Sequence, residues 1–160
     1  MNTKSEKNII VELQDSKEAP MDLLELADPS IDQVNKYLKH GRCFVLKLDL
    51  DIIVGAMVLQ ENSPDKIEIK NIAVSEQHQG QGFGKLMLNF ALDFATKSGY
   101  QKLTIATGNS SIGQLALYQK VGFEIVDVVK DYFIRNYSEP IFENGITCKH
   151  QIVLEKDILA

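Results

Sequence analysis

Runs of apolar and β-branched residues, separated by short polar stretches, fill the first half of the chain. Three such runs lie at 42–48, 52–60 and 66–74, and the polar stretches DLD and NSPD separate them. Runs of this kind are typical of strands, and such short connections favour antiparallel neighbours. The pattern therefore predicts an antiparallel meander. A short β-rich run at 8–14 precedes it, and residues 15–30 are predicted to be a loop with about one helical turn.

A helical period replaces this pattern after residue 82. Apolar residues recur there every three or four positions, as in an amphipathic helix, at 83, 86, 87, 90, 91, 94 and 95. Gly99 follows this stripe and predicts the end of the helix. Earlier in the chain, Ser30 and Gln33 have the spacing of a capping box, and a helical pattern continues from them up to Gly41.

The rest of the pattern completes a mixed α/β fold. Strands are predicted at 102–107 and 123–129, with a helix at 113–121 between them, and Gly122 ends that helix. An aromatic and acidic loop then precedes a last strand near 151–154. The chain has 160 residues, of which 44% are hydrophobic, enough for one core. We therefore expect a single domain over residues 1–160, with a mixed sheet of the α+β kind flanked by helices.

Composition excludes several classes of protein. A net charge of −5 disfavours a broad nucleic-acid surface, and no stretch is long and apolar enough to span a membrane. The N-terminal residues lack an apolar leader, so we expect a cytoplasmic protein. Cys43 and Cys148 are far apart and lack metal-ligand spacing, which predicts buried reduced thiols and no metal site. The sequence is also compatible with a homodimer.

Three alternating glycines, Gly80, Gly82 and Gly84, stand between a predicted strand and a predicted helix. Such a turn directs backbone N–H groups and the positive end of the helix dipole at one spot, which suits an anion. Glycine permits close approach of a phosphate, and Lys85 adds a positive charge. A plain corner needs only one glycine, so the three favour a phosphate site.

Two common phosphate-binding motifs fit this loop poorly. The phosphate loop of nucleotide triphosphatases requires a glycine where Gln79 stands and a Ser or Thr where Leu86 stands. The dinucleotide fingerprint requires the spacing G-x-G-x-x-G, whereas the spacing here is G-x-G-x-G. The first motif is excluded and the second is weak.

The loop instead resembles the Q/R-x-x-G-x-G/A loop of the GCN5-related N-acetyltransferases (GNAT). Downstream, LALYQKVGFEIV resembles the tyrosine-containing helix of that family, followed by its Gly-Phe pair and strand. The resemblance covers about Ile67 to Val129, and TGNSSIGQLALYQKVGF is similar to a subgroup of uncharacterised bacterial members. It implies the GNAT fold, with a central twisted, largely antiparallel sheet, and acetyl-CoA as co-substrate without a metal.

The resemblance also implies which residues bind the coenzyme. Backbone groups of Ile72, Ala73 and Val74 would hold the pantetheine arm, and the N–H near Val74 would polarise the thioester carbonyl. An amide side chain after the next strand often contacts coenzyme A, and here Asn109 and Ser111 share that assignment because the spacing to the tyrosine is displaced. The pyrophosphate would be held by a run of loop residues, namely Gln79, Gly80, Gln81, Gly82, Phe83, Gly84 and Lys85.

The strand before the loop changes phase. Ile67 and Ile69 lie on one face by alternation, whereas Ile72 and Val74 fall on the opposite phase. A β-bulge near residues 70–71 would return both pairs to the core face. A strand buried on both faces is the alternative.

Tyr118 and Glu68 match the proton carriers of the family. Tyr118 would protonate the leaving thiolate, and we expect Leu115, Val121 and Phe123 to fill the core without it. Glu68 would accept the proton of the amine. A core tyrosine and a solvated strand glutamate are the structural alternatives.

The acceptor is expected to be a primary amine of a small molecule or peptide. A non-catalytic module that senses acyl-CoA, and a general nucleotide-binding domain, are the alternative functions. Carboxylates and aromatic rings suit a cationic amine, and an acidic surface loop is the plainer interpretation of the same residues. The candidate acceptor residues are Asp131, Tyr132, Tyr137, Glu139, Glu143 and Asn144.

Overall fold

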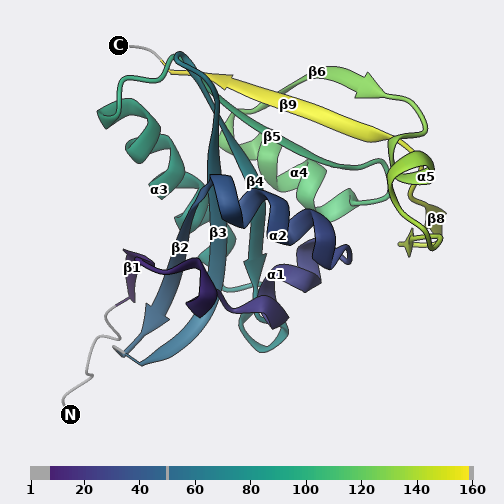
Figure 1. Cartoon of the computed structure of the whole chain (residues 1–160). Helices are drawn as coiled ribbons and strands as arrows, with labels where there is room; N and C mark the ends of the chain where they lie inside the picture. The colour runs from purple at the N-terminus through teal and green to yellow at the C-terminus, as the bar shows by residue number, and fades with distance from the viewer. Residues whose placement is uncertain (1–7, 50, 159–160) are drawn as a thin grey trace. The chain divides into compact units, whose positions relative to one another are not determined.

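The computed structural model describes residues 8–49 and 51–158. Its main sheet is mostly antiparallel and has seven strands, hydrogen-bonded in the order β1-β2-β3-β4-β5-β9-β6, and β7 and β8 form a separate pair (Figure 1). The predicted mixed sheet with flanking helices is therefore confirmed. The chain divides into two compact units, residues 1–60 with 70–90 and residues 61–69 with 91–160.

The first unit is built on the predicted meander. β1 (Asn8–Glu12) pairs with β2 (Arg42–Leu48), which pairs with β3 (Ile52–Ser63), and both pairings are antiparallel. The bounds of β2 and of β4 (Lys66–Val74) are those predicted from the sequence. β3 continues to Ser63, beyond its predicted end at residue 60.

Two helices cover one face of this unit. They are α1 (Met21–Ala27) and α2 (Ile31–His40), and η1 (Ser16–Glu18) precedes them. Leu23 and Leu24 of α1 are buried in a cluster with α2 and the strands, so this segment forms a helix rather than the predicted loop. The capping box is half formed, because the Ser30 hydroxyl accepts from the Gln33 N–H at 3.3 Å.

The long helix α3 (Phe83–Lys97) begins in the first unit. Phe90 contacts Phe44 edge-on at 5.2 Å, and Met87 lies over Gly55, where a Cβ would approach its sulfur to 3.0 Å. Because Phe44 neighbours Val45 of the α1 and α2 cluster, and neighbouring strand residues point to opposite faces, this part of α3 covers the other face.

The predicted apolar stripe of α3 is partly wrong. Leu86 is 40% exposed, whereas Leu88, which lies outside the stripe, is fully buried. The helix buries residues 83, 87, 88, 91 and 95, so four residues of the predicted stripe are buried and residue 88 widens the buried face to one side.

The second unit is centred on β5 (Lys102–Gly108). β5 pairs in parallel with the first half of β4 and antiparallel with β9 (Gln151–Asp157), which lies between β5 and β6 (Glu124–Val129) (Figure 1). α4 (Ile112–Val121) connects β5 to β6 and ends at Gly122, whose φ of 110° is left-handed.

Residues 130–150 contain short elements where a loop was predicted. They are α5 (Tyr132–Asn136) and the two-residue strands β7 (Phe142–Glu143) and β8 (Ile146–Thr147). Asn144 and Gly145 turn between the strands with φ of 55° and 72°. Elements this short carry no detectable hydrophobic period, which is why the sequence pattern did not predict them.

β6 is the last strand of the sheet, and its edge is irregular. Ile125, Val126 and Val128 are each about half exposed, at 50%, 51% and 52%. The pairing with β9 shifts between Ile125 and Asp127, which leaves Val126 as an extra residue. The Asp127 carboxylate accepts from the Val128 N–H at 2.8 Å. This edge therefore carries both a bulge and a capped N–H group.

Both cysteines are buried and carry free thiols, as predicted, and burial raises the pKa of Cys43 to about 11. Within residues 8–49 and 51–158, no helix is long and apolar enough to cross a membrane. The same part of the chain contains no group of three His, Cys, Asp or Glu side chains placed to hold a metal ion.

Candidate active site

The corner between β4 and α3 takes the conformation that its glycines allow. Gly80 and Gly82 have φ of 76° and 87°, in the left-handed region, with no atom within 4 Å of where a side chain would begin. The Gln79 side chain donates to the Val74 carbonyl at 3.0 Å and thereby ties the loop to the end of β4. The space beside Gly80 and Gly82 is therefore open, and the Gln79 side chain fixes the loop to β4.

Backbone donors at this corner have no partner within the helix. The Leu86 N–H donates to the Gly82 carbonyl at 3.0 Å, and this is the first hydrogen bond of α3. The N–H groups of Phe83, Gly84 and Lys85 precede it, so the helix offers them no carbonyl. Lys85 is exposed, and the first turn of α3 contains no acidic residue. The corner therefore suits an anion.

The second half of β4 leads into this corner. Ala73 is buried at 6% exposure, whereas Ile72 and Val74 are half-buried, so the expectation that these two would be the core residues is wrong. Asn71 is buried in their place. The buried positions alternate without a break from Ile67 to Ala73, so the change of phase that led us to expect a β-bulge near residues 70–71 is not observed.

Asn71 links β4 to the two N-terminal helices, a role that the sequence pattern did not predict. Its amide donates to the Leu24 carbonyl and to the Tyr37 hydroxyl, both at 2.8 Å, and the hydroxyl donates to Asp28 at 3.2 Å. Burial raises the pKa of Tyr37, which keeps its proton in this chain of bonds. These bonds join β4 to α1 and α2. In the sequence, the one indication of this role is an asparagine at a position in the strand where an apolar residue would be expected.

Glu68 lies in the other unit, on the first half of β4. Its Oε1 accepts from the Asn62 side chain of β3 at 2.8 Å, and its Cα partner in the parallel pairing with β5 is Thr104. Glu68 is half-buried as a residue, and the exposed bond from Asn62 orients its carboxylate. A general base would need such an orientation.

Tyr118 is the buried residue of α4, with 5% exposure. Leu115 and Val121 are only half-buried, so the expectation that they would fill the core in its place is wrong, although Phe123 is buried as expected. The tyrosine hydroxyl has no hydrogen-bond partner among the residues that the structure describes. Burial raises the pKa of Tyr118, which keeps the phenol protonated.

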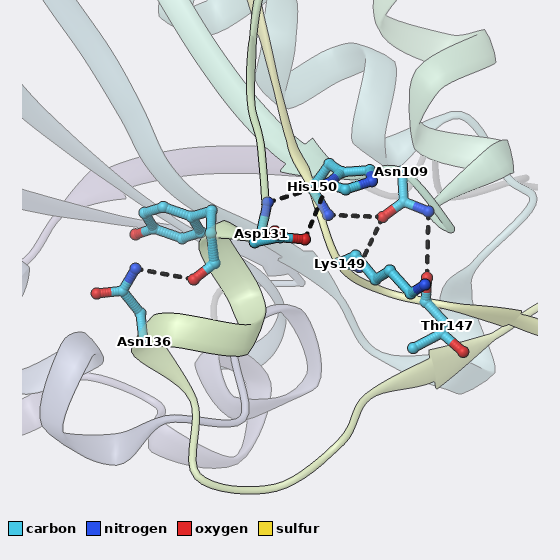
Figure 2. Close-up of polar contacts among 7 residues, drawn as sticks. Asn109, Asp131, Asn136, Thr147, Lys149 and His150 are labelled. Carbon is cyan, nitrogen blue, oxygen red and sulfur yellow. Dashed lines mark hydrogen bonds and ion pairs between the residues drawn. The ribbon is translucent and has the colours of Figure 1, made fainter.

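Asn109 anchors the segment after β8. Its side-chain amide donates to the Thr147 carbonyl at 3.1 Å, and its oxygen accepts from the N–H groups of Lys149 and His150 at 2.7 and 2.9 Å (Figure 2). Ser111, buried at 6% exposure, donates to Glu143 at 3.1 Å. Both predicted coenzyme residues therefore hold the 141–150 segment in place.

The predicted acceptor residues gather in the same part of the second unit. Asp131, with φ of 59°, donates its N–H to His150 at 3.0 Å, as Figure 2 shows, and precedes α5. Asn144 donates to the Ser110 carbonyl at 2.8 Å. The Tyr137 ring contacts the Phe133 ring at a tilt of 38°, with 5.3 Å between the ring centroids. The others are Tyr132, against Phe133 at 5.1 Å, Glu143, bonded to Ser111, and the exposed Glu139.

Residues 10–123 match the family model described as the acetyltransferase (GNAT) family. The chain belongs to this family. An uncharacterised N-acetyltransferase, YvbK of Bacillus subtilis, is 47% identical over 86% of this chain and 88% of its own length. The match sets aside the alternative of a general nucleotide-binding domain.

Solved structures of GNAT acetyltransferases have the same fold. One from Elizabethkingia anophelis, with acetyl-CoA bound, has 44% identity and a TM-score of 0.91 over 94% of this chain and 97% of its own. One from Bacillus subtilis, in complex with CoA, has 44% identity and a TM-score of 0.89 over 96% of this chain and all of its own. The predicted GNAT fold is confirmed.

The GNAT match also separates the predicted residues into two groups. The glycine corner, Glu68, Asn109 and Tyr118 lie inside the matched range of 10–123, whereas the acceptor candidates of residues 131–144 lie after it. The family therefore predicts the coenzyme and proton-transfer residues, and the acceptor residues have to be argued from this chain alone.

The contacts of Asn109 lead to a prediction about stability. Asn109→Ala removes three side-chain hydrogen bonds to backbone groups and should lower the free energy of unfolding by about 2–4 kcal/mol, with faster amide exchange at residues 147–150. Asn136→Ala is the control, because Asn136 makes one exposed bond, to the Tyr132 carbonyl (Figure 2). Equal stability of the two variants in urea would contradict the anchoring role.

Proposed function

We propose that this chain, acting as one domain over residues 1–160, transfers the acetyl group of acetyl-CoA to a primary amine of a small molecule or peptide. The amine would attack the thioester directly while both substrates are bound. The observation that carries the proposal is the β4–α3 corner, where Gly80 and Gly82 are left-handed and the first N–H groups of α3 lack helical partners. Family membership adds the chemistry.

The corner is the proposed site of the coenzyme pyrophosphate. Residues Gln79 to Lys85 would surround the phosphates with backbone N–H groups and one lysine. Backbone groups of Ile72, Ala73 and Val74 would bond the pantetheine arm. The Val74 carbonyl already accepts from Gln79, so its N–H is the group we assign to the thioester oxygen.

Glu68 and Tyr118 are the proposed proton carriers. Glu68 takes a proton from the acceptor ammonium, and the neutral nitrogen attacks the thioester carbonyl carbon. The C–N bond forms, the C–S bond breaks, and Tyr118 donates its proton to the departing sulfur. Two protons leave the nitrogen in all: one ends on the thiol by way of Tyr118, and the other passes from Glu68 to water.

Ser111 rather than Asn109 is our choice for the polar contact to coenzyme A from the loop after β5. All hydrogen-bonding groups of the Asn109 amide except one N–H are used by the 147–150 backbone. Ser111 has one side-chain bond, to Glu143, and its hydroxyl keeps acceptor capacity.

We place the enzyme in the bacterial cytoplasm. Two of the similar proteins come from Bacillus subtilis and Elizabethkingia anophelis, and the two cysteines are free and buried as in reduced compartments.

An amine panel tests the proposed function against a module that binds acyl-CoA without turnover. The panel contains an aromatic monoamine, spermidine, an amino acid and a peptide with a free N-terminus, and release of free thiol from acetyl-CoA is measured. We expect at least one amine to raise thiol release well above the rate of hydrolysis. Tight acetyl-CoA binding without amine-dependent release would favour the sensing module.

A pair of glycine variants tests the corner. Gly82 and Gly99 have φ of 87° and 83° and open space around them, so Gly82→Ala and Gly99→Ala should each cost about 1 kcal/mol of stability. We expect the affinity for acetyl-CoA, by calorimetry, to fall at least about 10-fold in Gly82→Ala only, because the added methyl enters the anion site. Equal affinities in both folded variants would rule the corner out.

Tyr118→Phe tests whether Tyr118 is the general acid that protonates the leaving thiolate. The change keeps the buried ring and removes only the hydroxyl, so we expect acetyl-CoA affinity within a few-fold of wild type and kcat lower by about 10²-fold. Tyr100→Phe, in the turn after α3, serves as the control. A folded Tyr118→Phe enzyme with near-normal kcat on its best amine would defeat the assignment.

A further inference from the structure

Glu68 belongs to a row of polar residues that crosses three strands of the second unit. In the sheet register Glu68 of β4 is the partner of Thr104 of β5, and Thr104 is the partner of Glu155 of β9. Residues in direct register point to the same face of a sheet, with neighbouring strands about 4.8 Å apart. The Thr104 side chain therefore lies between two carboxylates.

The Glu155 carboxylate is paired with lysine side chains, whereas the Glu68 carboxylate accepts from Asn62. Glu155 accepts from Lys66 at 2.8 Å and lies 3.6 Å from Lys102, and the bond from Lys66 lowers the pKa of Glu155, which keeps it ionised. Because Lys66 is on β4 and Glu155 is on β9, their ion pair passes over β5. Glu155 is thus engaged with two lysines.

The Thr104 hydroxyl is unpaired within the part of the chain that the structure describes. Thr104 is 4% exposed, and its Oγ1 is a buried oxygen without a hydrogen bond among residues 8–49 and 51–158. Its neighbours Leu103 and Ile105 are apolar and buried, so a valine at this position would fill the same space without an unpaired polar group. A buried hydroxyl without a hydrogen bond lowers the stability of the fold. Its presence at this position points to a ligand that bonds to it.

We propose that Thr104 and Glu68 together hold the amino group of the acceptor, with the Thr104 hydroxyl accepting one N–H of the substrate. This inference rests on the proposed function and on Glu68 as its base. The ammonium gives one proton to the Glu68 carboxylate. The nitrogen keeps two N–H groups, and the bond to Thr104 fixes one of them, which sets the direction of the lone pair.

Thr104→Val is the test, because it keeps the shape of the side chain and removes the hydroxyl. With the fastest amine of the panel we expect KM for the amine to rise about 10-fold or more, acetyl-CoA affinity to stay within about 2-fold, and the melting temperature to rise by about 2–4 °C. Thr104→Ser should restore the wild-type KM. Thr107→Val, on the same strand with its partner at Ile152, is the control.

The outcomes separate this inference from the proposed function. If wild type acetylates an amine and Thr104→Val gains stability with unchanged KM for that amine, the hydroxyl is only a buried polar group and the inference is overturned. If wild type acetylates no amine of the panel, the proposed function fails and the inference fails with it. A rise in KM that Thr104→Ser reverses supports the contact.

Discussion

The left-handed backbone of Gly80 and Gly82 is the constraint on which the proposed coenzyme site depends. Residues with a Cβ pay a steric cost in this region, so the turn from β4 into α3 requires glycine there. The first N–H groups of α3 have no carbonyl partner within the helix, and the Gln79 side chain ties the loop to the Val74 carbonyl. The proposed anion site is thus a property of the backbone, to which Lys85 adds a positive charge.

Local patterns predicted the elements that stand on their own hydrophobic runs. β2 and β4 begin and end at the predicted residues, and α3 and α4 are followed within two residues by the predicted glycines, Gly99 and Gly122, which have positive φ. The spacing of apolar residues alone did not predict every residue on the buried side of a helix. Leu86 fits the stripe of α3 yet is exposed, because burial depends on the strands that the helix meets, and these are distant in sequence.

The candidate site was predictable where it follows a motif and hidden where it depends on long-range contacts. The glycine corner follows from the spacing of its glycines, and Glu68 and Tyr118 follow from the resemblance to the GNAT family. The roles of Asn71 and Asn109 arise from partners far away in the chain, such as Leu24 for Asn71 and Thr147 for Asn109, and the proposed role of Thr104 arises from its register with Glu68. No pattern in a single sequence contains those pairings, and short elements such as β7 and β8 carry no period of their own.

The irregular edge of β6 limits the growth of the sheet. A further strand arriving there would have to displace the Asp127 carboxylate from the Val128 N–H and bury its charge, and the extra residue Val126 would spoil the ladder. The half-exposed valines and isoleucine beside it are therefore poor templates for fibril-like stacking. An acidic side chain and one inserted residue let the chain keep apolar surface at a sheet edge without seeding aggregation.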